Sequence, residues 1–145
     1  MVLSTIREIL VQAQETYGDG DAVRYKAGPK KIETKSYTQL REDSESFSRA
    51  MCALGEQGKH VAVIGSTSYH WLIAYLGTVN CGNVAVPLDA SLPAAELCEL
   101  LDRADVTTLV LDECRADVAG LARETCPKLK HLISMQKPVH EDGWL

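Results

Sequence analysis

The fold of this chain is decided by the stretch VAVIGSTSYHWLIAYL at residues 61–76. Its first part, 61–65, is a short continuous apolar run, which is typical of a strand covered on both faces. A polar turn at 65–68 follows, and we expect a helix over 68–81 that ends at Gly82. This helix has almost no polar face, which indicates burial on several sides. The stretch therefore predicts a strand-turn-helix unit inside a layered protein.

The same alternation continues toward the C-terminus. We expect strands at 84–87, 107–111 and 131–135, and helices at 93–104 and 115–124. Pro93 suits the first turn of its helix, because a missing N–H there leaves no hydrogen bond unmade. Strands that alternate with helices favour a largely parallel sheet with helices on its faces. The order of the strands does not follow from the sequence.

A helix and a hairpin precede this pattern. We expect a helix at 4–17 and then two strands, at 22–26 and 31–35, around a Gly28-Pro29 turn. A second helix begins at Ser36, which forms a capping box with Gln39, and it ends at Gly55. Its apolar stripe consists of Leu40, Phe47, Ala50, Met51 and Leu54, with Ser44 as the polar exception.

These elements predict an α/β fold: a largely parallel sheet flanked by helices, preceded by a helix and a β-hairpin. We expect a single domain over 1–145, with an irregular tail at 136–145 that shows no periodicity. A chain of this size buries about 68–70% of its unfolded surface, which is enough for a hydrophobic core.

Composition excludes several classes of function. The net charge of −5 argues against a nucleic-acid partner, which requires a basic face. The longest apolar stretch, 71–76, is far shorter than the roughly 20 residues that span a bilayer, so no transmembrane segment is expected. The four histidines lack the close spacing of metal ligands, so no metal site is expected either.

The cysteines indicate a reducing compartment. They are odd in number and form no CxxC pair, so we expect free thiols and a cytoplasmic protein. Their positions are Cys52, Cys81, Cys98, Cys114 and Cys126. Cys52 and Cys81 lie near expected helix ends without a basic neighbour in sequence, which favours buried structural thiols over reactive ones.

Other residues near the deciding stretch suggest chemistry. The turn at 65–68 can hold a phosphate at a helix N-terminus, but it lacks the lysine of a P-loop, so a capped turn is favoured. His70 is interpreted as a histidine packed in the core or at an interface, since no G-x-S-x-G elbow supports a catalytic base. Trp71 and Tyr75 fit either core packing or the wall of a substrate pocket.

The order and spacing of several segments over 20–112 resemble the adenylate-forming (AMP-binding) superfamily, most of all its long-chain fatty acid–CoA ligase branch. The matching strings are SYTQL at 36–40, LG at 54–55, HVAVI at 60–64, GSTSYHWLIAYL at 65–76 and CGNVAVPLD at 81–89, followed by Leu92-Pro93 and Glu96-Leu97. Thr67 stands where the branch has Asn and is still able to cap a helix. His70 replaces a Glu, which removes a carboxylate.

The resemblance implies a parent enzyme that activates a fatty acid or another carboxylic acid with ATP and Mg and passes it to CoA. The family's Pro-Lys-Gly phosphate loop, its Tyr-Gly-x-Thr-Glu segment, its ribose-binding Asp and its C-terminal Lys do not occur before Leu145. Adenylation needs hydrogen-bond donors and a cation aimed at the reacting phosphorus. We therefore expect an N-terminal subdomain that is silent alone, without catalytic or cofactor-binding residues, in which Trp71 and Tyr75 form part of the acyl-pocket wall.

Two other functions remain open at this stage. One is a free-standing interaction or structural module that kept the fold, and the other is a small flavodoxin-like nucleotide-binding domain. For the leading hypothesis the expected partner is the remainder of the parent synthetase. We also expect self-association through apolar surface that the missing remainder leaves exposed.

Overall fold

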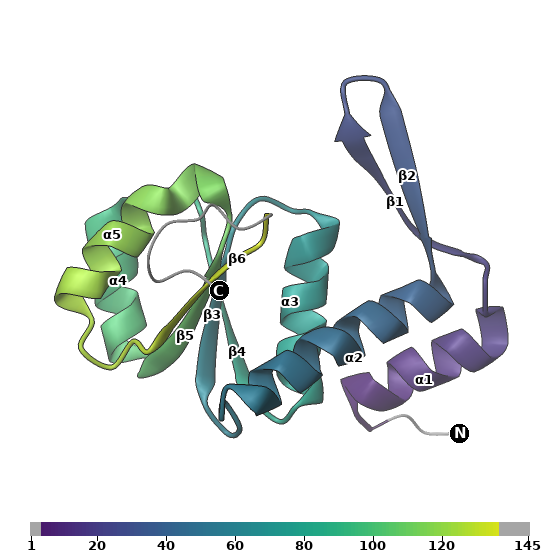
Figure 1. The fold of residues 1–145 in the computed structure, drawn as a ribbon, viewed down its shortest axis with the longest axis horizontal. Coiled ribbons are helices and arrows are strands. Elements are labelled where there is room, and N and C mark those ends of the chain that lie inside the picture. Colours follow the sequence, from purple (N-terminus) through teal and green to yellow (C-terminus); the bar gives the residue numbers. More distant parts are fainter. Residues whose placement is uncertain (1–3, 137–145) are drawn as a thin grey trace.

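The computed structural model describes residues 4–136, and its core is a four-stranded parallel sheet in the order β4-β3-β5-β6. The strands are β3 (His60–Ile64), β4 (Val84–Leu88), β5 (Val106–Leu111) and β6 (His131–Ser134). The sheet stands between two pairs of helices (Figure 1). One pair is α2 (Tyr37–Ala53) and α3 (Tyr69–Asn80), and the other is α4 (Ala94–Arg103) and α5 (Ala116–Thr125). The predicted α/β fold is confirmed.

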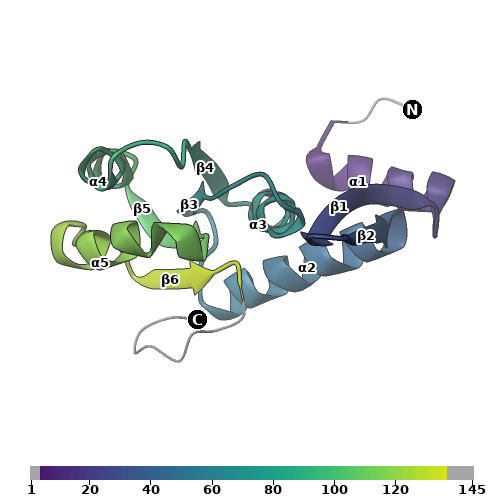
Figure 2. The ribbon, with the colours of Figure 1, turned by 90° about the horizontal axis from the view of Figure 1, so that it is seen from above.

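The N-terminal elements extend this frame on one side. Helix α1 (Ile6–Tyr17) and the antiparallel hairpin of β1 (Asp21–Gly28) and β2 (Lys31–Ser36) lie with α2 and α3, at the opposite end from α4 and α5 (Figure 2). Tyr69 of α3 links the two parts: its hydroxyl donates to Asp43 Oδ2 at 2.7 Å, and its ring stacks on Tyr25 of the hairpin. The hairpin is thereby fixed to the helical layer.

The apolar run of β3 is explained by its two covered faces. Ala62 and Ile64 pack into the cluster beneath α4 and α5, whereas Val61 and Val63 pack into the cluster beneath α2 and α3. All four side chains are fully buried. Burying a valine or isoleucine side chain contributes about 1.5–3 kcal/mol, so the central strand is a main source of stability.

Where α2 crosses α3, the residues that α2 buries differ from the predicted apolar stripe. Ser44, the expected polar exception, is buried and donates its hydroxyl to Leu40 O at 2.7 Å, while Ala50 is exposed. The cause is Gly77 of α3, which crosses over this part of α2: a Cβ there would lie 2.8 Å from Ser44 O. Small residues at the crossing let the two backbones approach closely.

The starts of α1, α3 and α4 also differ in detail from the sequence predictions. Thr5 and Glu8 form a capping box on α1 that the sequence reading missed. The cap of α3 is Ser68, whose Oγ accepts from Trp71 N at 3.1 Å, so Thr67 is not the cap. Pro93 is the N-cap residue of α4 and lies one position before the first turn. A 3-10 turn at Glu113–Arg115 precedes α5.

Helix α3 is less covered than its composition predicts. Its buried residues are Tyr69, Ala74, Gly77 and Thr78, while the other apolar side chains are only half-buried. Part of an almost wholly apolar helix therefore faces outward in this chain. The predicted tail at 136–145 lies outside the described residues beyond position 136.

Candidate functional site

The candidate site is the edge of the sheet at which the parallel strands end. The helix that follows β3 lies on one face and the helix that follows β5 lies on the other, so the chain changes direction between these two central strands. Ligands of open α/β sheets bind at such a switch point, outside the carboxyl ends of the strands. The segments that meet here are 65–68 after β3, 89–92 after β4 and 112–115 after β5.

Asp112 is the polar centre of this edge. Its carboxylate accepts hydrogen bonds from Ser66 Oγ at 3.0 Å, Gln136 Nε2 at 2.9 Å and the Cys114 N–H at 3.3 Å. Burial raises the pKa of Asp112, but these hydrogen bonds outweigh it and leave the pKa below the ordinary value. Asp112 is therefore ionised at neutral pH and draws the ends of three strands together.

Gly65 is required for this close approach. A Cβ on it would lie 3.0 Å from Asp112 Cβ and 3.3 Å from Met135 Sδ. Such distances are tighter than nine in ten real Cβ contacts, so a larger residue would require its neighbours to shift by a few tenths of an ångström. The turn after β3 thus has the capped strand-to-helix form that the sequence favoured.

A cavity of about 440 Å³ opens beside this centre. Its lining consists of Gly65, Ser66, Thr67, Trp71, Leu88, Asp89, Ala90 and Ser91. The predicted pocket residue Trp71 is thus at the wall of a cavity. Tyr75 stacks on Trp71, with ring centroids 5.5 Å apart and planes 5° from parallel, but it does not line this cavity.

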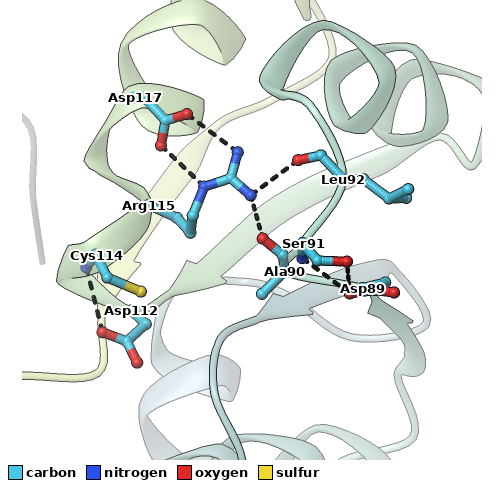
Figure 3. A network of polar contacts seen from close by, with 8 residues as sticks. All are labelled: Asp89, Ala90, Ser91, Leu92, Asp112, Cys114, Arg115 and Asp117. Carbon is cyan, nitrogen blue, oxygen red and sulfur yellow. Dashed lines mark hydrogen bonds and ion pairs between the residues drawn. The ribbon is translucent and has the colours of Figure 1, made fainter.

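Arg115 holds the far rim of the cavity in place (Figure 3). Its Nη1 donates to the carbonyls of Ala90 and of Leu92, the latter at 2.9 Å, and its Nε and Nη2 donate to the two oxygens of Asp117 at 3.0 Å each. Paired donation of this kind fixes the guanidinium plane. Arg115 therefore ties the loop after β4 to the start of α5.

Asp89 stabilises the same loop from within. Its Oδ1 accepts from the backbone N–H of Ser91 at 2.8 Å and from the Ser91 hydroxyl at 2.7 Å (Figure 3). These bonds lower the pKa of Asp89, the backbone bond most of all. Sequence reasoning missed Asp89, Asp112 and Arg115 as site residues. The signal that could have found the two aspartates is their position at strand ends: Asp112 directly follows the predicted strand 107–111, and Asp89 stands two positions after the predicted strand 84–87.

The other candidates from the sequence are placed elsewhere. His70 is exposed on α3, which contradicts packing in the core of this chain, and its interpretation as an interface histidine stays a prediction. Cys52 is also exposed, contrary to the expected burial, whereas Cys81 is half-buried. Neither thiol lies at the carboxyl edge, because Cys52 in the last turn of α2 and Cys81 directly after α3 stand where these helices lead back to the opposite edge.

The crevice offers hydroxyl, carboxylate and indole groups. The residues that line it include no lysine or arginine, and the neighbouring Arg115 is already bound to Asp117 and to two carbonyls. Within residues 4–136, no three His, Cys, Asp or Glu side chains gather as a metal site requires. No helix in this range is long and apolar enough to cross a membrane.

An open parallel sheet, helices on both faces and a polar crevice at the switch point define a doubly wound α/β protein. The family follows from comparison with known proteins: the model of the AMP-binding enzymes matches residues 10–143. The chain belongs to the AMP-binding enzyme family. The predicted superfamily and its N-terminal region are confirmed.

Several relatives of this chain are named as CoA ligases. The chain is 32% identical over 113 residues to a methyl-dioxo-octahydro-indenyl propanoyl:CoA ligase of Mycobacterium tuberculosis, covering 74% of this chain and 22% of that protein. It is 26% identical over 143 residues to a long-chain-fatty-acid–CoA ligase of Rattus norvegicus, covering 96% of this chain and 21% of that protein. The chain thus spans about a fifth of the length of these relatives.

Solved structures agree on the fold. The crystal structure of a benzoate CoA ligase from Burkholderia xenovorans LB400 matches with a TM-score of 0.81 over 92% of this chain and 26% of that one, at 20% identity. At this identity the likeness concerns the fold alone. The relatives act on different acids by name, so the long-chain fatty acid branch is not singled out.

Proposed function

We propose that this chain is the N-terminal portion of an ATP-dependent acyl-CoA synthetase. The whole enzyme would activate a carboxylic acid with ATP and Mg and transfer the acyl group to CoA. We propose a fatty acid as this carboxylic acid. The observation that carries this proposal is the family match over 10–143, joined to relatives that are CoA ligases. The segment strings quoted above favour the long-chain fatty acid branch.

We propose that the chain alone is catalytically silent and binds neither ATP, Mg nor CoA. The support is chemical: the residues that line the crevice at the carboxyl edge include the carboxylate of Asp89 and no lysine or arginine, whereas phosphoryl chemistry needs a cation that neutralises the developing charge. In the whole enzyme, Trp71 and Tyr75 would contribute to the wall of the acyl pocket. We also propose a cytosolic location, because all five cysteines are free thiols.

Acid-dependent release of pyrophosphate from ATP tests this function. The purified 145-residue chain should release none above background with fatty acids of several lengths. If the coding DNA continues past Leu145, the longer protein should release pyrophosphate with one of them. A stop codon directly after Leu145 would instead favour the non-catalytic interaction module, and turnover by the short chain would refute its silence.

A further inference from the structure

A second cavity, of about 420 Å³, lies where the C-terminal ends of α2 and α3 meet, far from the carboxyl edge. Two thiols, those of Cys52 and Cys81, line it together. Three guanidinium groups, those of Arg7, Arg41 and Arg49, line it as well. We call this feature the thiol cavity.

The helix packing brings the two thiols to the same seam. Helices α2 and α3 lead into β3 and β4, which pair in parallel, so both helices end at the same edge of the sheet (Figure 1). Ser48 of α2 touches Gly77 of α3, with Ser48 Oγ donating to Gly77 O at 2.7 Å. Cys52 and Cys81 each follow that contact by four residues, about one helical turn. Both therefore lie near this contact, and both line the thiol cavity.

Each sulfur atom accepts a hydrogen bond from a side-chain amide. Gln57 Nε2 donates to Cys52 Sγ at 3.3 Å, and Asn83 Nδ2 donates to Cys81 Sγ at 3.1 Å. Such donors stabilise negative charge on sulfur, and the thiolate is the reactive form. Burial, and then the neighbouring Cys52, raise the pKa of Cys81. The exposed Cys52 is therefore the thiol that an outside reagent meets first.

The charge around the cavity favours an anionic reagent. Its lining holds three arginines and one carboxylate, that of Glu45, which pairs with Arg41 at 2.8 Å. Helix C-termini disfavour a thiolate because their carbonyls carry partial negative charge, and the arginines oppose this effect. A cationic cleft also raises the local concentration of anions.

We propose that Cys52 and Cys81 form an oxidisable pair that exchanges with small disulfides bearing carboxylates, of which glutathione disulfide is the probe. The Cys52 thiol loses its proton to solvent, and its sulfur attacks one sulfur of the small disulfide. That S–S bond breaks, and the departing thiolate takes up a proton. Cys81 then attacks Cys52 Sγ in the same way and releases the second small thiol. Two protein thiols are oxidised and one small disulfide is reduced to two thiols.

The pair is tested by treating the purified chain with glutathione disulfide and mapping the products by mass spectrometry. The wild type should finish with a Cys52–Cys81 disulfide and little mixed disulfide. Cys81→Ser should instead accumulate glutathione on Cys52, and Cys52→Ser should leave Cys81 reduced. Cys114→Ser, which removes an exposed thiol at the other edge, should behave as the wild type.

Cystamine, a cationic disulfide, tests the role of charge. Arg49→Gln should slow the reaction of Cys52 with glutathione disulfide on the order of tenfold and leave its reaction with cystamine unchanged or faster. A stable mixed disulfide on wild-type Cys52 would overturn the pairing. If Cys52 and Cys114 reacted at equal rates with glutathione disulfide and with cystamine, the cavity would not recruit anions. That result would overturn the proposal. Neither result depends on the synthetase activity.

Discussion

Gly77 sets the distance between α2 and α3. A Cβ at this position would lie 2.7 Å from Phe47 Cδ1 and 2.8 Å from Ser44 O. The carbonyl belongs to a helical backbone and cannot rotate away. A single hydrogen atom in place of a side chain therefore allows the two helices on this face to pack against each other and on the sheet.

We expect Gly77→Ala to lower the free energy of unfolding by about 1–3 kcal/mol through overpacking, in urea titrations followed by circular dichroism. Gly120→Ala is the matched control. Gly120 also lies in a helix, but a Cβ there meets nothing within 4 Å, so this change should stabilise by about 0.5–1 kcal/mol. Equal effects at the two glycines would contradict the close crossing.

Asp112 makes the carboxyl edge sensitive to acid. Its pKa in the folded chain lies below the ordinary value of 3.8, so its contribution to stability is complete above that value and is lost as the pH falls through the folded pKa. We expect Asp112→Asn to destabilise at pH 7, and the difference from the wild type to shrink as the pH is lowered below about 4.

Thermal melts at a series of pH values measure this difference. Asp19→Asn is the control, because Asp19 is exposed and its removal should shift the melting temperature little at any pH. A difference between wild type and Asp112→Asn that stays constant down to pH 2 would show that the charge of Asp112 contributes nothing to the edge.

The site was only partly predictable from single residues. Trp71 was identified because it stands in a recognisable string, and the structure places it at a cavity wall. Arg115 gave no local signal for its contact with the loop after β4, because Ala90 and Leu92 receive it through backbone carbonyls more than twenty positions away. Contacts to distant backbone are independent of the partner's residue type, so no sequence pattern reports them.

The elements themselves were predicted almost completely. Hydrophobic periodicity and breakers such as Gly55 and Gly82 act within one turn or strand, and both glycines have the positive φ that a helix stop requires. The order of the strands, in contrast, could not be predicted from local patterns. The position of β5 beside β3 depends on packing between segments more than forty residues apart, which no local pattern encodes.

Substitutions test the assignment of Ser68 as the N-cap residue of α3. Ser68→Ala should cost about 1 kcal/mol of unfolding free energy, because Ser68 Oγ satisfies the Trp71 N–H. Thr67→Ala, one position earlier, should change stability by less than about 0.5 kcal/mol, since Thr67 is exposed and not the cap. Urea titrations of both variants measure these two changes in unfolding free energy. The reverse order of the two effects would move the start of the helix to Thr67.

Helix α3 leaves part of its apolar surface exposed in this chain. Tyr75 and Val79 are half-buried on a helix with almost no polar face, and neither belongs to a core cluster of the described residues. In relatives of which this chain covers only about a fifth, further chain is available to cover such a surface. Exposed apolar patches promote association.

We therefore expect the purified chain to self-associate reversibly, with a sedimentation coefficient that rises with protein concentration. Tyr75→Lys should shift it toward monomer. Ile32→Lys removes an apolar side chain that is 69% exposed on the hairpin and should leave association unchanged. A monodisperse monomer at high concentration would contradict this expectation, as would association that is insensitive to Tyr75→Lys.

We propose that this chain has the scaffold of a carboxylate-activating enzyme without the groups that hold a triphosphate. Titration calorimetry with ATP in the presence of Mg tests it most directly, because binding is measured without reliance on turnover. We expect no saturable heat from the purified chain up to millimolar nucleotide. A saturable one-to-one isotherm, abolished by a substitution at the carboxyl edge such as Asp112→Asn, would contradict the claim.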